Sequence, residues 1–265
     1  PDTETEYLDT SGTGNWIPLA RRATGYSDYG SSGMYEPGKV MFVGGGRPPT
    51  GITELIDLNA GTPSWRTSAP MAFARRHHNA TILPDGTVLV TGGTATNEFN
   101  DATNSIFPAE LWNPASETWT TLASMQVPRV YHSTALLLPD GRVLSAGGGR
   151  PAAVNGEDYE NAEIYSPPYL FKGARPTIDS VPASVGYNSG LDITTPDGAS
   201  IQSVTLVRLS SVTHAFNMNQ RFNRLSFTRT ASGLRATTPA GPNLAPPGHY
   251  MLFILNVQRS EERRV

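Results

Sequence analysis

Short runs of β-prone residues, each ended by turn residues, recur along the first two thirds of the chain. The clearest example is residues 129–149, where an apolar run at 134–138 leads into Pro139-Asp140-Gly141. A second β-prone run at 142–146 then stops at three glycines. Two such runs joined by a tight turn predict an antiparallel hairpin.

This pattern occurs three times. Residues 31–46 and 78–93 show the same order of strand, turn, strand and glycines, and the glycine clusters begin at positions 44, 92 and 147. Each cluster is followed by a further strand pair that contains a Trp or Tyr, at residues 53–65, 109–119 and 162–167. Units of about 50 residues with four short strands and a glycine cluster after the second are typical of kelch-type propeller blades.

The number of blades raises a question of closure. Propellers close with about 4 to 8 blades, and the repeats up to about residue 168 supply roughly three. Three blades would leave two unpaired sheet edges, which promote aggregation. We therefore expect this chain to be the C-terminal part of a larger propeller protein, with further blades before it, or to depend on a second chain.

The rest of the chain predicts a second β unit. A proline-bounded linker at 167–176 is followed by short apolar strands, among them 201–208, 224–228 and 249–256. About ninety residues with roughly seven strands and Gly and Pro turns predict a β-sandwich. No segment keeps a helical period.

The expected fold class is therefore all-β, with two domains. Residues 1–168 hold the incomplete propeller, which opens with an irregular lead-in at 1–22, and residues 175–265 hold the sandwich.

Composition narrows the function classes. The net charge of -3 gives no general attraction to nucleic acid. No apolar run approaches the roughly 18 residues of a membrane helix. The chain has no cysteine, which excludes a disulfide framework or a thiolate metal site within it.

The pair Tyr131-His132 at the mouth of the third hairpin combines two possible metal ligands. Neighbouring side chains of a regular strand point to opposite faces, so the strand must bend or only begin there if both serve one site. His214 lies in a loop between sandwich strands, at 209–222, and such a loop could bring a third ligand to the pair. Two imidazoles and a phenolate suit Cu(II), although a lone histidine in a loop is more often simply a satisfied polar residue.

The other histidines are weaker candidates. Within the repeats of this chain, His77 and His78 begin the second blade where Tyr131 and His132 begin the third. They could therefore line a substrate pocket. His249 begins the predicted strand at 249–256 and is expected to be a strand residue at the surface. The glycine clusters are not phosphate-binding loops, because no predicted helix follows them.

The chain resembles the C-terminal half of the galactose oxidase and glyoxal oxidase family over residues 30–256. The motifs that carry the resemblance occur in order across both domains: Arg129-Val130-Tyr131-His132-Ser133, Pro167-Pro168-Tyr169-Leu170, Arg175-Pro176, Thr213-His214, Asn219-Gln220-Arg221 and Pro247-Gly248-His249-Tyr250.

The resemblance implies a secreted copper radical oxidase with a seven-bladed kelch propeller and a C-terminal immunoglobulin-like domain. Members use O₂ to oxidise a small primary alcohol, aldehyde or sugar, and they release H₂O₂. Carried over by motif, Tyr131 would be the axial phenol and general base, and His132 and His214 would be the two imidazole ligands of copper. The radical-bearing tyrosine of the family is cross-linked to a cysteine in earlier blades. That Cys-Tyr cofactor is expected only in a longer parent chain, because this chain has no cysteine.

A second hypothesis comes from a different class. The chain could be a non-catalytic propeller and sandwich module that binds carbohydrate or a protein partner, with Tyr131 and His132 as structural residues. A cysteine and a tyrosine in matching upstream blades would favour the oxidase.

Overall fold

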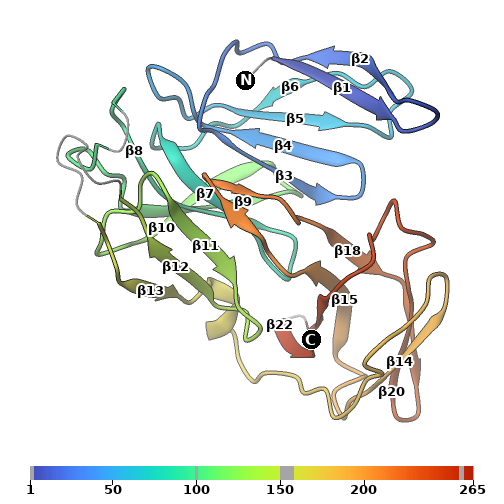
Figure 1. Ribbon diagram of the computed structural model, residues 1–265. Helices are drawn as coiled ribbons and strands as arrows, with labels where there is room; N and C mark the ends of the chain where they lie inside the picture. The colour runs from blue at the N-terminus through green and yellow to red at the C-terminus, as the bar shows by residue number, and fades with distance from the viewer. Residues whose placement is uncertain (1–2, 99–100, 150–157, 257–259, 265) are drawn as a thin grey trace.

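The computed structural model describes residues 3–98, 101–149, 158–256 and 260–264; the predicted domains also include residues 1–2, 99–100, 150–157, 257–259 and 265, which lie outside the described ranges. The described chain is built from antiparallel strands and contains one short 3₁₀ helix, Pro168–Phe171, where the first unit ends (Figure 1). The all-β prediction of about three blades followed by a sandwich is confirmed. The described residues form no helix of the length and apolar character that a bilayer crossing requires.

Three blades follow one another along the chain. The first contains β3 (Ser31–Glu36), β4 (Lys39–Val43), β5 (Thr53–Asp57) and β6 (Arg66–Ser68). The second contains β7 (Arg76–Ile82), β8 (Val88–Thr94), β9 (Pro108–Asn113) and β10 (Thr118–Ser124). The third contains β11 (Ser133–Leu137), β12 (Val143–Gly147) and β13 (Ala162–Tyr165). In each blade, neighbours in sequence are neighbours in the sheet, and β7 packs between β3 and β11.

The expected irregular lead-in is wrong. Residues 4–21 form a hairpin of β1 (Glu4–Asp9) and β2 (Asn15–Arg21). The hairpin lacks the usual apolar and polar alternation because its side chains are mostly exposed, including Leu8 and Trp16. Trp65 Nε1 in the first blade donates to Thr5 Oγ1 at 2.7 Å, which ties the hairpin to that blade.

An ion pair with a buried arginine recurs where the chain enters each blade. An arginine before the blade meets a glutamate of that blade's third strand, and the same glutamate accepts a backbone N–H from the segment that links the blades. The pairs are Arg22–Glu54 at 3.3 Å, Arg75–Glu110 at 2.6 Å and Arg129–Glu163 at 3.6 Å. Because each pair satisfies buried charges and backbone donors together, it fixes the path between one blade and the next.

The sandwich consists of two sheets. One contains β18 (Phe222–Leu225), β15 (Ile201–Arg208), β21 (Tyr250–Asn256) and β22 (Ser260–Arg264), and the other contains β14 (Gly190–Thr194), β20 (Gly233–Thr237) and β19 (Phe227–Thr230). The predicted strand at 224–228 is in fact two strands, because the chain changes sheet at Ser226.

Strand β21 joins the two units. Its alternate residues Met251, Phe253 and Leu255 belong to the core shared with the blades, whereas Leu252 and Ile254 belong to the core between the two sandwich sheets. Since successive side chains of a strand point to opposite faces, a run that is apolar throughout indicates a strand buried on both sides. The contact with the blades also includes Thr205 Oγ1, which donates to Pro84 O at 2.9 Å.

Candidate metal centre

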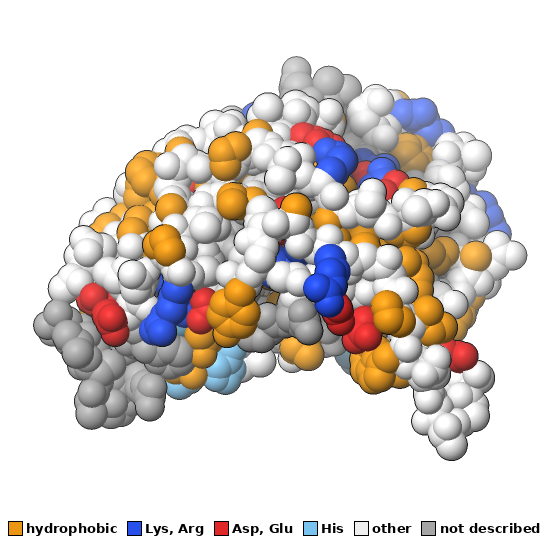
Figure 2. Space-filling model, turned by 90° about the horizontal axis from the view of Figure 1, so that it is seen from above, with side chains coloured by type: hydrophobic (Ala, Val, Ile, Leu, Met, Phe, Trp, Pro, Cys, Tyr) orange, Lys and Arg blue, Asp and Glu red, His pale blue; other side chains and the backbone are white. Residues whose placement is uncertain are grey.

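Three of the predicted site residues lie together, although they come from two units of the fold. The ring centroids of Tyr131 and His132 are 3.9 Å apart, those of Tyr131 and His214 are 5.5 Å apart, and those of His132 and His214 are 5.0 Å apart. His132 and His214 are exposed and Tyr131 is half-buried, so the cluster opens to solvent. On the face shown in Figure 2, histidine side chains reach the surface beside hydrophobic ones, and Lys and Arg are scattered among Asp and Glu.

The backbone at the mouth of the third blade allows the neighbours Tyr131 and His132 to serve one site. His132 has a left-handed backbone with φ 63°, and strand β11 begins directly after it. Gly149 N donates to Tyr131 O at 2.9 Å and holds this turn against the end of β12. Residues other than glycine rarely adopt a positive φ. Backbone strain of this kind is typical of functional sites.

His214 stands at the tip of a hairpin that extends from the sandwich to the blades. The hairpin consists of β16 (Val212–Thr213) and β17 (Phe216–Asn217), and its two central residues, His214 and Ala215, have φ 53° and 65°. A two-residue turn of this kind normally contains Asn and Gly, because both positions need a positive φ. Ser31 of the first blade holds the tip in place: its buried Oγ donates to Ala215 O at 2.9 Å.

The hydrogen bonds of the imidazoles leave suitable nitrogens for a metal ion. His132 Nδ1 lies 3.2 Å from Gly149 O, and since a carbonyl only accepts, Nδ1 is the protonated nitrogen in that bond and Nε2 has the lone pair. His214 Nδ1 is 2.6 Å from Thr213 Oγ1; this hydroxyl can donate or accept, so the contact occupies Nδ1 without fixing which nitrogen carries the proton. Metal-binding histidines commonly use the second ring nitrogen in this way.

The donor set depends on the phenol. Among the described residues, no group of three or more His, Cys, Asp or Glu side chains could hold a metal ion. Two imidazoles with the oxygen of Tyr131 form a mixed N and O set, which fits Cu(II). Tyr131, His132 and His214 therefore offer donor atoms of the types that a Cu(II) ion prefers.

The structure brings His77, but not His78, to this cluster. His77 is 1% exposed, and its ring centroid lies 4.2 Å from that of Tyr29 and 5.5 Å from that of Tyr131. Burial, with the nearby charge of Arg76 as the next cause, lowers the pKa of His77 to about 3, so the ring is neutral. His78 is completely buried, and its ring packs so close to Gly44 that a Cβ there would lie 2.5 Å from His78 Cε1.

The strand registers shift the alignment of the second and third blades by one residue from the alignment that the sequence repeats suggested. His78 pairs with Gly92 and Ser133 pairs with Gly147, so His77 is the structural equivalent of His132. Both residues have left-handed backbones.

Tyr29 is a residue of the cluster that the sequence did not reveal. It lies just before the first blade, and its φ of 54° is similar to those of His77 and His132. Its ring centroid is 5.9 Å from that of Tyr131. Burial, with Tyr131 as a smaller cause, raises the pKa of Tyr29. Its place before the first strand of a blade was the one available signal, because the candidates in the other two blades occupy the same place.

His249 is exposed, as predicted, but strand β21 begins one residue later at Tyr250, so the prediction that His249 is a strand residue is wrong.

Comparison with known proteins places these observations in a family. Residues 52–169 match the family described as Glyoxal oxidase N-terminus, and residues 175–260 match the family described as Galactose oxidase-like, Early set domain. A galactose oxidase of Gibberella zeae is 30% identical over 280 aligned residues, which cover 97% of this chain and 40% of that protein. The aldehyde oxidase GLOX of Vitis pseudoreticulata is 32% identical over 231 residues, which cover 79% of this chain and 44% of that protein.

A solved structure agrees over the whole chain. It is described as a novel fungal alcohol oxidase with catalytic diversity among the AA5 family, in complex with copper. The TM-score is 0.92 and the identity 30%, and the match covers 100% of this chain and 59% of that one. The chain spans about two fifths of the length of the curated galactose oxidase it matches.

Proposed function

Because this chain belongs to the galactose oxidase and glyoxal oxidase family, we propose that it provides the copper ligands of an oxidase for primary alcohols or aldehydes. The observation that carries the proposal is the approach of Tyr131, His132 and His214 from two separate units of the fold. In the proposed reaction an alcohol and O₂ give an aldehyde and H₂O₂, so the substrate loses two electrons and two protons and O₂ gains them.

The side chains have distinct roles in this proposal. The Nε2 atoms of His132 and His214 would hold the ion, because their Nδ1 atoms are occupied by Gly149 O and Thr213 Oγ1. Bound copper supplies a Lewis acid and a one-electron redox centre. The phenol oxygen of Tyr131 takes the hydroxyl proton of the substrate as general base, for which it must lie within hydrogen-bond reach of that hydroxyl.

The proposal extends to the substrate side of the centre. His77 and Tyr29 offer a neutral imidazole and an aromatic ring beside Tyr131, and these groups suit a small uncharged alcohol, aldehyde or sugar. The division into blades over 1–168 and a sandwich over 175–265 has a function here, because the second unit delivers His214. By family resemblance, we place this chemistry outside the cell and assign the cross-linked Cys-Tyr cofactor to a longer parent chain.

Copper titration followed by electron paramagnetic resonance tests the proposed ligands. We expect one tetragonal, nitrogen-rich Cu(II) spectrum from this chain, and we expect His214→Ala to abolish it. His249→Ala is the matched control, since His249 is another exposed histidine of the same sandwich and should leave the spectrum unchanged. A wild-type spectrum in His214→Ala would exclude His214 as a ligand.

Turnover separates copper binding from catalysis. We expect the copper-loaded chain by itself to release no H₂O₂ from alcohols or aldehydes, because it has no cysteine for the family's cross-linked cofactor. Steady release of H₂O₂ would contradict the assignment of that cofactor to a longer parent. A chain that binds no copper but binds a carbohydrate or a protein partner would favour the non-catalytic module.

A further inference from the structure

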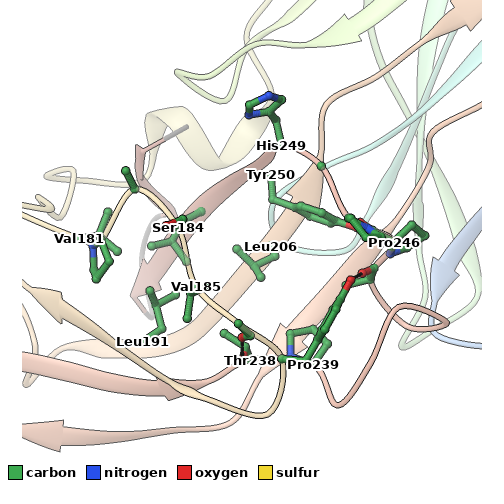
Figure 3. A pocket seen from close by; sticks show the side chains of 18 residues that line it. Val181, Ser184, Val185, Leu191, Leu206, Thr238, Pro239, Pro246, His249 and Tyr250 are labelled. Atoms are coloured by element: carbon green, nitrogen blue, oxygen red, sulfur yellow. Dashed lines mark hydrogen bonds between the residues drawn. The ribbon is translucent and has the colours of Figure 1, made fainter.

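The sandwich contains a cavity of about 580 Å³ whose lining side chains are drawn in Figure 3. It lies between the segment that precedes β14 and the segment that leads into β21, and its lining includes Leu191, Leu206 and Leu252. Leu191 and Leu252 are also buried in the core between the two sandwich sheets. Cavities of roughly 300–1,000 Å³ are typical of sites for small molecules.

The lining contains no charged side chain. None of its residues is Asp, Glu, Lys or Arg. Desolvating an ion without a partner is costly, and this cavity has no side chain of fixed charge to offer in return. The cavity therefore selects against charged ligands.

Three of the four hydroxyl groups in its lining, all except that of Ser184, donate to backbone carbonyls of the protein. Tyr187 Oη donates to Ala245 O at 2.7 Å, Tyr250 Oη donates to Pro246 O at 2.8 Å, and Thr238 Oγ1 donates to Gly186 O at 2.7 Å. These bonds direct the polar ends of both tyrosines to the backbone, and they leave ring surface as the main contact. Aromatic rings and proline rings together favour a flat, ring-bearing ligand.

The same bonds hold the walls in place. The Tyr187 bond joins the segment before β14 to the segment before β21, and Asn188 N donates to Pro239 O at 3.0 Å. Prolines at 182, 239, 246 and 247 further restrict the backbone around the cavity. A preformed site loses little conformational entropy when a ligand binds.

We propose that this cavity is a binding site for a neutral, ring-bearing small molecule such as a phenol or an aromatic alcohol. The ring of the ligand packs on Leu206 and the tyrosine rings, and its polar end lies toward the exposed His249 and Ser184. This site does not depend on the proposed copper chemistry, because none of the three proposed copper ligands lines it.

Two fluorescent probes with the same ring skeleton test the proposal. N-phenyl-1-naphthylamine is neutral, and 8-anilinonaphthalene-1-sulfonate adds one negative charge. The measurements are made in about 0.2 M salt, which screens long-range repulsion between the negatively charged protein and the anionic probe. We expect saturable 1:1 binding of the neutral probe with a dissociation constant of roughly 10 µM. We expect the anionic probe to bind at least about 10-fold more weakly, because the lining offers its sulfonate no side chain of fixed positive charge.

A matched pair of substitutions locates the binding. Val185 lines the cavity and is 45% exposed, so Val185→Trp should fill part of the space without disturbing the core and should weaken binding about 10-fold. Ile17 is 44% exposed on the remote hairpin of β1 and β2, and Ile17→Trp should leave binding unchanged. Copper should displace neither probe.

Three outcomes would overturn the proposal. They are the absence of saturable binding of the neutral probe, equal or tighter binding of the anionic probe, and binding that Ile17→Trp weakens but Val185→Trp does not. Chemical shift changes of the Leu191, Leu206 and Leu252 methyl groups on addition of the neutral probe give a direct check of location. None of these outcomes depends on whether the copper proposal holds.

Discussion

The entrances to the second and third blades use the same backbone but create opposite environments. His77 and His132 are equivalent residues, with φ 59° and 63°, yet His77 is buried and His132 is exposed. In the second blade, two residues, Arg76 and His77, separate the buried Arg75 from His78, which is the structural equivalent of Ser133 in the third blade. In the third blade, Val130, Tyr131 and His132 separate Arg129 from Ser133, so this entrance is one residue longer.

The difference shows how a repeat acquires a site. Arg76, which occupies the shorter entrance, pairs with Asp28 at 2.7 Å and helps to close it. The longer entrance turns Tyr131 and His132 toward the hairpin that carries His214. One entrance therefore supports the fold, whereas the other presents the proposed copper ligands to solvent.

The largest expected effect comes from breaking the ion pair at the second entrance. Arg75→Ala leaves the completely buried Glu110 without its partner and should lower the free energy of unfolding by about 3–5 kcal/mol. Arg129→Ala should cost less, because Glu163 is 24% exposed and water can solvate it. Urea unfolding measures both, with the exposed Arg66→Ala as control at about 1 kcal/mol or less. Equal losses for Arg75 and Arg129 would show that the two entrances are equally closed.

Replacing each of the two equivalent histidines by alanine is the next test. His132→Ala should weaken Cu(II) binding by about 100-fold, or about 2.7 kcal/mol, with little loss of stability. His77→Ala should cost roughly 1–3 kcal/mol of stability, because it removes a buried ring, and should change copper affinity by less than about 3-fold. Calorimetric titration and thermal unfolding distinguish the two. A loss of copper binding in His77→Ala alone would reverse the assignment.

The pH dependence of stability tests the closed state of the second entrance. Burial, with Arg75 as the next cause, lowers the pKa of His78 to about 3, whereas the unfolded chain has an ordinary histidine pKa of about 6.5. Between these values the unfolded state binds more protons, so stability falls as pH decreases from about 6.5 to 3.

The substitution His78→Gln should reduce this slope by up to about 1.4 kcal/mol per pH unit. Unfolding at pH 7, 6 and 5 measures the slope. Thr91→Ala is the control, because it changes a buried residue that does not titrate in this range. An unchanged slope in His78→Gln would mean that His78 is charged or solvated in the fold.

The smallest effect concerns the support that the first blade gives to His214. Ser31→Ala removes the hydrogen bond to Ala215 O and should cost about 1 kcal/mol, seen as a copper affinity lowered by roughly 5-fold and an altered nitrogen coupling in the spectrum. Ser32→Ala is the control, since its neighbouring contact to Gln220 uses the backbone carbonyl. Identical spectra from the two variants would exclude a positioning role for Ser31.

The sequence by itself determined the strand pattern and the most specific candidates. Repeated apolar runs, Pro-Asp-Gly turns and glycine clusters are local features, so they predict blades without knowledge of distant contacts. The adjacent Tyr131 and His132, and a histidine on a sandwich loop, were visible as types and positions in the chain.

Only the tertiary structure decided which of these residues meet and which are buried. The sequence repeats matched His132 with His78 and not with His77, and the exposure of His77 and His132 depends on Tyr29, Tyr131 and the His214 hairpin, which come from other segments. The hairpin of β1 and β2, the change of sheet at Ser226 and the cavity of the sandwich depend likewise on pairing and packing between distant residues. Burial is a property of a residue's neighbours in space, and the local pattern along a chain does not contain it.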